Sequence, residues 1–203
     1  MNKVFSLYLI SLLFFGCAKQ AVNLNESGAA YLLESKAQIR SSNETNSVNI
    51  EIALLPQKAA RFEITATLGV GVATVLMTPQ EITYVLHSTK EFYRGPFHEK
   101  TLYPIFKKNI DPQILWRIIH NQSPASAKIK CELDADKRPL SCRDSEGYTV
   151  KWVYEEPPRR RIELKSDNFE MKWLFTSQSY LGDYQNETFV LKKPDSYKEI
   201  IIR

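Results

Sequence analysis

The stretch that decides the fold is Arg61-Phe-Glu-Ile-Thr-Ala-Thr-Leu-Gly-Val-Gly-Val-Ala-Thr-Val75. Its first half alternates apolar and polar residues, which places Phe62, Ile64 and Ala66 on one side of an extended chain. Alternation with a period of two is typical of an antiparallel strand that buries one face. The stretch therefore predicts a half-buried strand that begins at Arg61.

Other segments before residue 90 show the same alternation. It is clear in residues 48–54 and 82–86 and weaker in residues 31–41. Turn-forming residues separate these segments at 41–46, 56–59 and 78–80. The first half of the chain is therefore predicted to be a series of antiparallel strands.

The pattern changes to helical spacing after Gly95-Pro96. Leu102, Ile105 and Phe106 fit a helix, although Pro104 restricts this segment to an early turn or two short pieces. Asp111-Pro112 is a typical helix start, because Asp caps free N–H groups and Pro suits the first helical position. The predicted second helix carries one apolar stripe, made by Ile114, Leu115, Ile118 and Ile119.

Strand patterns return after residue 128. The predicted strands are 148–154, 161–165, 169–176, 187–191 and 199–202. The order strands, short helices, strands predicts an α+β fold: one strongly curved antiparallel sheet with short helices on one side. If the helices pack loosely, the apolar space between the layers is a ligand cavity; if they pack tightly, it is a filled core.

The N-terminus has the pattern of a lipoprotein signal. Lys3 gives a basic start, residues 4–15 carry no charge, and Gly16 precedes Cys17. The apolar run is shorter than the roughly 20 residues that span a membrane. The Phe14-Phe15-Gly16-Cys17 site resembles a lipobox, with Phe14 in place of the usual Leu. Cys17 is therefore predicted to carry lipid such as palmitate; the alternative is an ordinary secretory signal with an incidental cysteine.

This signal sets the predicted organisation and location. Residues 1–16 are the signal peptide, 17–29 a lipidated tether, and 30–203 one folded domain. Ala18 and Lys19 follow the cysteine, with no Asp directly after it. In bacteria that use such an Asp for inner-membrane retention, this implies an outer-membrane anchor with the domain facing the periplasm. The formal net charge of +4 includes Lys3, so +3 remains after cleavage, which is too mild to indicate nucleic-acid binding.

Cys131 and Cys142 are the remaining cysteines. They flank a segment with turn composition, between two predicted strands. Cysteines facing each other across a hairpin can reach disulfide range, and a disulfide suits an exported protein. The alternative is a two-cysteine metal site, which lacks the four ligands that zinc requires.

The sequence offers no positive case for an enzyme. His87, His98 and His120 form no metal-ligating pair, and His120 is expected at a helix end, where positive charge suits the helix dipole. The sequence contains no nucleophile elbow and no phosphate-binding glycine loop. We therefore expect neither catalysis, nor a metal, nor a cofactor.

Several of these segments together resemble LolB, the outer-membrane receptor that accepts lipoproteins from the periplasmic carrier LolA. Residues 61–75 are similar to its strand–Leu-Gly–strand segment, and residues 102–124 to its two short helices. The strand pair at 150–154 and 161–172 fits the same pattern, and residues 189–194 resemble the closing strand of LolA-like proteins. The likeness spans most of residues 30–194.

The resemblance implies an open half-barrel, covered by short helices, around a cavity that holds acyl chains. The residues expected to line that cavity are Ile50, Ile52, Phe62, Ile64, Tyr84, Leu86, Leu115 and Ile118. Leu68 and Gly69 match the membrane-insertion loop of the receptor. Leu68 alternatively continues the apolar face of the strand that begins at Arg61, as a core residue.

The resemblance also implies the function and the partners. We expect a monomeric lipoprotein of the outer membrane that binds acyl chains, with a LolA-like periplasmic carrier as a possible partner. Its role would be the reception or localisation of lipoproteins. The alternative is a structural or assembly lipoprotein that uses the same fold, with a filled core, as a protein-binding scaffold.

Overall fold

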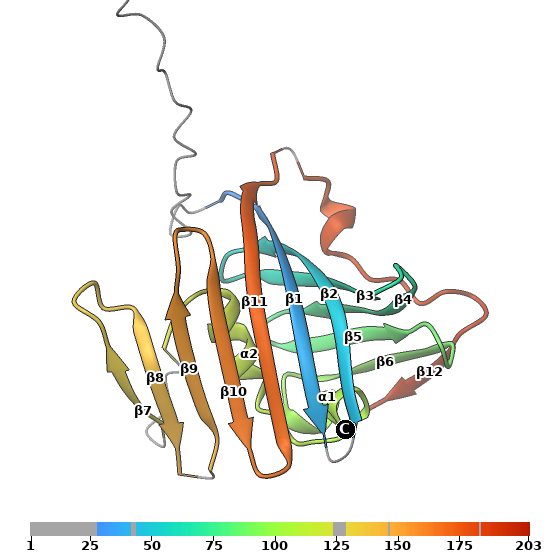
Figure 1. Ribbon diagram of the computed structural model, residues 1–203. Coiled ribbons are helices and arrows are strands. Elements are labelled where there is room, and N and C mark those ends of the chain that lie inside the picture. The colour runs from blue at the N-terminus through green and yellow to red at the C-terminus, as the bar shows by residue number, and fades with distance from the viewer. Residues whose placement is uncertain (1–27, 42–43, 124–128, 146, 183) are drawn as a thin grey trace, which may run out of the picture.

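Twelve strands from the described residues form one open sheet (Figure 1). The computed structural model describes residues 28–41, 44–123, 129–145, 147–182 and 184–203. The predicted signal peptide, Cys17 and the tether up to residue 27 lie outside the described residues. The strands are β1 (Tyr31–Ser41), β2 (Glu44–Leu55), β3 (Ala59–Ala66), β4 (Gly71–Met77), β5 (Glu81–Leu86), β6 (Glu91–Pro96), β7 (Ile129–Leu133), β8 (Pro139–Asp144), β9 (Thr149–Tyr154), β10 (Arg160–Ser166), β11 (Phe169–Tyr180) and β12 (Lys198–Ile201). The helices are α1 (Glu99–Phe106), α2 (Pro112–Ile119) and the short 3-10 helix η1 (Asn186–Phe189).

The strand order is β12-β6-β5-β4-β3-β2-β1-β11-β10-β9-β8-β7. Every neighbouring pair is antiparallel except β12 and β6, which are parallel. The predicted antiparallel sheet is therefore confirmed for most of its width and corrected at one edge. The exception arises because the chain leaves β11 in the middle of the sheet and returns at the far edge, beside β6 (Figure 1).

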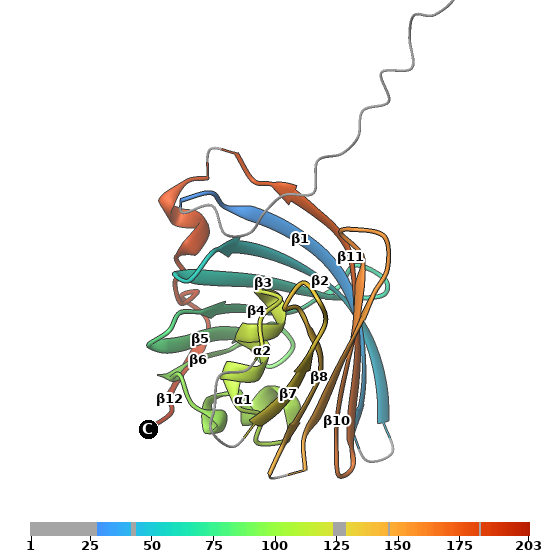
Figure 2. The same cartoon turned by 90° about the vertical axis from the view of Figure 1, so that its left-hand side faces the viewer.

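The sheet is strongly curved, and α1 and α2 lie inside its concave side (Figure 2). The helices are only eight residues long each, and they cover part of that side. The expected helical cover is thus partial. Within the described residues, no helix has both the length and the apolarity needed to cross a membrane.

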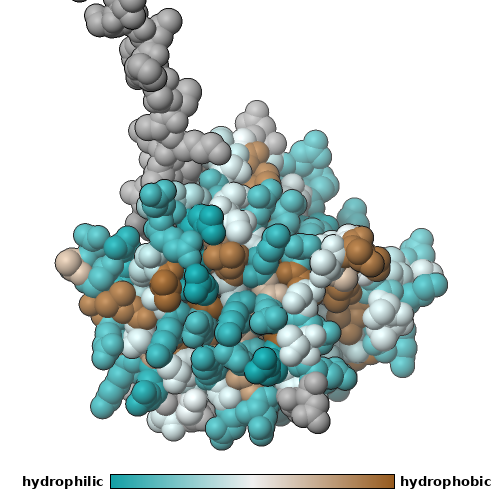
Figure 3. Space-filling view, in the orientation of Figure 1, coloured by the Kyte–Doolittle hydropathy of each residue, from teal (hydrophilic) through white to brown (hydrophobic). Residues whose placement is uncertain are grey.

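Alternation along the strands separates a buried face from an exposed one. In β1, Leu33 and Ala37 are buried, whereas Glu34 and Lys36 between them are exposed. The outer face in Figure 3 is accordingly largely hydrophilic, with hydrophobic surface in separate patches. Apolar side chains therefore concentrate on the concave side, between the sheet and the helices.

The second helix begins as predicted. Asp111 is the N-cap of α2, and its Oδ1 accepts a hydrogen bond from the Gln113 N–H at 2.8 Å. The first helix differs from the prediction, because α1 continues through Pro104. Proline removes only one donor from so short a helix, and the packing of Leu102 against the core holds it in place.

The predicted strand at 187–191 is wrong. Residues 186–189 form η1, and the chain then crosses the outer face of the sheet without joining a ladder. The Arg61 guanidinium donates hydrogen bonds to the carbonyls of Thr188 and Val190, at 3.4 and 3.2 Å. These side-chain contacts hold the segment where ladder hydrogen bonds were expected.

Candidate functional site

The concave side of the sheet holds an apolar cavity of about 650 Å³. This volume lies within the roughly 300–1,000 Å³ that is usual for ligand pockets. Strands β1 to β5 and β11 form its walls, together with α1 and the start of α2. The apolar lining residues are Ile39, Val48, Ile50, Phe62, Ile64, Val72, Ala73, Val75, Met77, Leu86, Leu102, Pro104, Ile105, Phe106, Leu115, Met171 and Trp173.

The position of α1 leaves this space open. Thr101 and Leu102 in its first half are buried, whereas Ile105 and Phe106 in its second half are only half-buried. The first half is fixed by hydrogen bonds: the Tyr84 hydroxyl donates to the Thr101 carbonyl at 3.0 Å, and the Thr101 hydroxyl donates to the Pro96 carbonyl at 2.7 Å. The second half of α1 extends over the cavity as part of its wall.

Tyr84 holds α1 from the core rather than from the cavity. Its ring stacks on Tyr93 with centroids 4.6 Å apart. Burial raises the pKa of the Tyr84 hydroxyl far above its ordinary value, with the nearby Tyr93 and Glu91 adding to the effect. Tyr84 therefore stays protonated and remains a hydrogen-bond donor to α1.

The polar side-chain atoms of Ser35 and Trp173, in the part of the wall formed by β1, β2 and β11, are hydrogen-bonded to one another or to the backbone. Trp173 Nε1 donates to the Ser35 hydroxyl at 2.9 Å, and that hydroxyl donates to the Ile50 carbonyl at 2.9 Å. The Trp173 ring thus adds apolar surface to the cavity without an unsatisfied N–H group. This wall can contact hydrocarbon at no cost in lost hydrogen bonds.

Exposed lining residues mark the mouth of the cavity. These are Glu44 and Asn46 at the start of β2, Val72 in β4 and Lys107 directly after α1. The turn between β3 and β4, residues 67–70, lies next to this mouth, because Ile64 and Val72 on either side of it line the cavity. We refer to residues 67–70 as the β3–β4 tip.

The β3–β4 tip presents apolar side chains to solvent. Leu68 is 92% exposed and Val70 is 64% exposed. The turn is closed by the Ala66 N–H, which donates to the Val70 carbonyl at 2.8 Å, and Gly69 supplies the positive φ of 79° that the turn requires. The structure thus places Leu68 at a loop tip and not in the core. Its role in membrane insertion stays a prediction.

The structure separates the predicted lining residues into two groups. Five of them line the cavity: Ile50, Phe62, Ile64, Leu86 and Leu115. Ile52, Tyr84 and Ile118 do not; all three are fully buried in the packed core. These three side chains belong to the cluster of buried core residues, where their neighbours leave no space for a ligand.

Sequence reasoning missed several lining residues, and some were detectable. Met171 and Trp173 alternate along a segment that the sequence already predicted as a strand, so their inward orientation follows from the period of two. Ile105 and Phe106 belong to the predicted first helix. Val75 and Met77 lie on β4. The sequence of this strand is nearly all apolar, so it does not show which side chains point toward the concave side.

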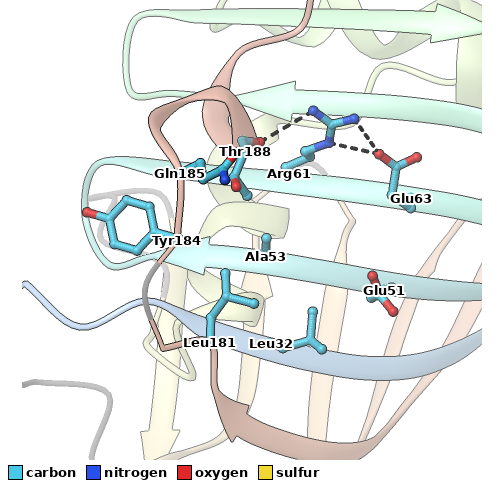
Figure 4. Close-up of a pocket in the computed structure, with 9 residues that line it drawn as sticks. All are labelled: Leu32, Glu51, Ala53, Arg61, Glu63, Leu181, Tyr184, Gln185 and Thr188. Atoms are coloured by element: carbon cyan, nitrogen blue, oxygen red, sulfur yellow. Dashed lines mark hydrogen bonds and ion pairs between the residues drawn. The ribbon is translucent and has the colours of Figure 1, made fainter.

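A second hollow lies on the outer face, under the segment that follows β11 (Figure 4). It measures about 500 Å³ and is lined by Leu32, Glu51, Ala53, Arg61, Glu63, Leu181, Tyr184, Gln185 and Thr188. Arg61 points across it to Thr188 and forms an ion pair with Glu63 at 2.7 Å. The guanidinium thus serves to hold the chain together, and the apolar cavity is the better candidate site.

The described residues contain no cluster of three or more His, Cys, Asp or Glu side chains suited to a metal ion. Cys131 and Cys142 form a disulfide, with an S–S distance of 2.07 Å, that joins β7 to β8. The predicted disulfide is confirmed, and the alternative of a two-cysteine metal site is excluded for this pair. The bond fixes the strand at one edge of the sheet.

Comparison with solved structures identifies the architecture. A domain described as an outer membrane lipoprotein-sorting protein from Vibrio parahaemolyticus matches with a TM-score of 0.58, over 82% of this chain and 91% of that one. A LolA superfamily protein from Nitrosomonas europaea matches with a TM-score of 0.50, over 80% and 90% of the two chains. This chain has the LolA-like fold. The sequence identities are only 10% and 9%, so the likeness defines the fold and not the ligand.

The LolA-like fold extends to other proteins. A DUF1329 family protein from Desulfovibrio piger matches with a TM-score of 0.53 at 8% identity, over 82% of this chain and 91% of that one. No protein-family model matches the sequence, and no curated protein matches it. The LolA-like fold that the family resemblance implied is therefore supported by solved structures and not by sequence comparison.

Proposed function

We propose that this protein binds acyl chains in the concave cavity, as a lipid-anchored receptor or sorting factor for lipoproteins at the outer membrane. The observation that carries the proposal is an apolar cavity of about 650 Å³ whose mouth adjoins an exposed apolar tip. The LolA-like fold and the name of the Vibrio parahaemolyticus domain support it. Cys17 would hold the lipid anchor, and the domain would face the periplasm.

The proposed activity needs binding and no catalysis. Burial of hydrocarbon contributes about 0.8 kcal/mol per methylene, so a single long chain supplies enough free energy for tight binding. The chain then moves to the bilayer if the bilayer holds it more tightly than the cavity does. A LolA-like periplasmic carrier is the partner that we infer would deliver the cargo.

The scaffold alternative rests on a filled core. An open apolar cavity of this volume supports acyl-chain binding over that alternative, because a dry, packed core leaves no space of this size. The two functions differ in one measurable property, which is the saturable binding of an acyl chain.

A fluorescent fatty-acid probe tests the proposal on the purified full-length chain. Ile64 is half-buried and lines the cavity, so Ile64→Trp should fill part of it and weaken probe binding about tenfold or more. Val153→Trp adds the same side chain to an exposed position on β9 and should leave binding unchanged. Wild-type protein that binds no probe, or Ile64→Trp protein that is folded and binds like wild type, would contradict the proposal.

A further inference from the structure

The polar residues of the cavity lie together at its mouth. Every lining residue is apolar except Ser41, Glu44, Asn46 and Lys107. Ser41 and Asn46 flank the end of the β1–β2 hairpin, and Lys107 caps α1 on the facing side. An amphiphile whose chain fills the cavity must keep its polar head in water, because an unpaired polar group is costly to bury. Its head therefore lies among these four side chains.

The two charges at the mouth are opposite and come from different elements. Lys107 is exposed and follows α1 in a left-handed conformation, with φ of 53°. Glu44 is the exposed first residue of β2. Neither side chain forms an ion pair or a hydrogen bond within the described part of the chain. Both charges are therefore available to a ligand.

Among the described residues, the charged ones near Lys107 do not engage its ammonium group. The adjacent ammonium group, that of Lys108, donates to the Asp167 carbonyl at 2.7 Å and is committed there. The acidic neighbour of Lys107 is Glu91, and its carboxylate already accepts hydrogen bonds from the hydroxyls of Thr89 and Tyr93. Lys107 is thus the cation at the mouth that a phosphate group can reach.

We propose that the ligand of this cavity is an acyl lipid with a zwitterionic phosphoethanolamine head, whose phosphate binds Lys107 and whose ammonium group faces Glu44. This inference rests on the proposed function, because it assigns a head to the acyl chain. Lysine binds phosphate as a point charge, and a carboxylate accepts hydrogen bonds from an ammonium group. A neutral head uses neither charge, and a purely anionic head meets repulsion from Glu44.

Three lipids that share one acyl chain separate these possibilities. Native mass spectrometry of the full-length protein, incubated with equal amounts of lysophosphatidylethanolamine, lysophosphatidylglycerol and monoacylglycerol, reports the ratio of the three adducts. An exposed ion pair changes affinity by a factor of about two to five. Lysophosphatidylethanolamine should therefore exceed lysophosphatidylglycerol by about two- to fivefold, and monoacylglycerol by more.

Two variants assign the contacts, and a third is the control. Lys107→Gln should reduce the preference for both phospholipids over monoacylglycerol by about two- to fivefold. Glu44→Gln should abolish the preference for the ethanolamine head over the glycerol head. Lys100→Gln removes an equal charge from an exposed position on α1 that does not line the cavity, and should change nothing.

The outcomes separate the head-group assignment from acyl-chain binding itself. Equal binding of the three lipids by wild-type protein would overturn the head-group assignment and leave acyl-chain binding intact. A Lys100→Gln protein that behaves like Lys107→Gln would overturn it too, because the effect would then be one of overall charge. Binding of none of the three would instead refute the proposed function.

Discussion

His120 joins the end of α2 to the turn between β2 and β3. Its Nε2 accepts a hydrogen bond from the Gln57 N–H at 3.2 Å, and its Nδ1 lies 2.7 Å from the Trp116 carbonyl. A ring nitrogen that accepts carries no proton, so Nδ1 carries it and donates to Trp116. The buried side chain is thus a neutral imidazole with both nitrogens in use.

This arrangement makes stability depend on pH. Burial lowers the pKa of His120 below its ordinary value of 6.5, with the neighbouring Arg117 adding to the effect. Between the two pKa values the unfolded chain binds a proton that the folded chain does not, so stability falls as the pH drops below about 6.5. The stabilisation is fully present above that pH.

We expect wild-type protein to lose more free energy of unfolding between pH 7 and pH 5 than His120→Gln does. The thermodynamic ceiling for one such group is about 1.4 kcal/mol per pH unit. Urea denaturation of both proteins across this range measures the difference, and all other titrating groups cancel. Identical pH profiles would show that the pKa of His120 is the same in the folded and the unfolded chain, and would contradict a buried, neutral imidazole.

The charge state of His120 could not be predicted from the sequence. Its place at a helix end was predicted, together with a positive charge that suits the helix dipole. In the structure His120 is neutral instead. Its ring is buried, and the N–H of Gln57, 63 positions earlier in the sequence, donates a hydrogen bond to it. A contact over that separation is invisible in the local pattern, and it decides the charge.

Among the elements, α1 depends on one glycine of β6. A Cβ at Gly95 would lie 2.6 Å from the Thr101 hydroxyl oxygen and 3.0 Å from Ile202 Cβ. Because real Cβ atoms essentially never approach another heavy atom within 3.0 Å, Thr101 on α1 has to move if Gly95 is replaced, and the contact with Ile202 becomes unusually tight. The close approach also explains how the Thr101 hydroxyl reaches the Pro96 carbonyl.

Gly95→Ala should therefore destabilise the protein by about 1–3 kcal/mol, the usual cost of overpacking. It should also weaken fatty-acid binding, since α1 forms part of the cavity wall. Gly71→Ala is the matched control: a Cβ there meets His87 at an ordinary 3.4 Å, and stability should change by less than about 0.5 kcal/mol. Urea denaturation measures both, and equal effects would contradict this account of α1.

The strands and helices that could be predicted are those with a clear local sequence pattern. β3 and β5 follow from their alternation, and α2 follows from the Asp111 cap and one apolar stripe. The parallel pairing of β12 with β6 was not predictable, because it joins segments about a hundred residues apart in sequence. The same holds for the cavity: alternation gives the inward side chains, but the curvature of the sheet decides which of them meet empty space.

At the scale of the whole molecule, the chain enters the domain at the end opposite to the mouth. β1 starts at Tyr31 and ends at Ser41, which lines the cavity. Eleven extended residues cover about 35 Å. The β3–β4 tip lies toward the mouth, since Ala66 before it pairs with Val48, and Val48 pairs with Ala37 in the second half of β1.

A lipid on Cys17 is compatible with contact between this tip and the same membrane. A chain of n residues spans at most about 3.6 Å per residue, so the stretch from Cys17 to Ser27 can bridge up to about 40 Å. That reach is comparable to the length of β1. A lipid anchor at Cys17 would therefore not prevent the domain from turning its mouth toward the bilayer.

Leu68→Glu tests whether the tip delivers lipid. The side chain is 92% exposed, and surface substitutions usually shift stability by less than about 0.5 kcal/mol, so folding and fatty-acid binding should remain as in wild type. Transfer of the bound probe to liposomes should slow, because a carboxylate opposes entry of the tip into the apolar part of the membrane. Leu133→Glu, at a half-exposed position on β7 away from the mouth, is the control and should transfer normally. If Leu68→Glu binds and transfers the probe at the wild-type rate, the tip is an exposed turn without a role in delivery, and release depends on the cavity alone.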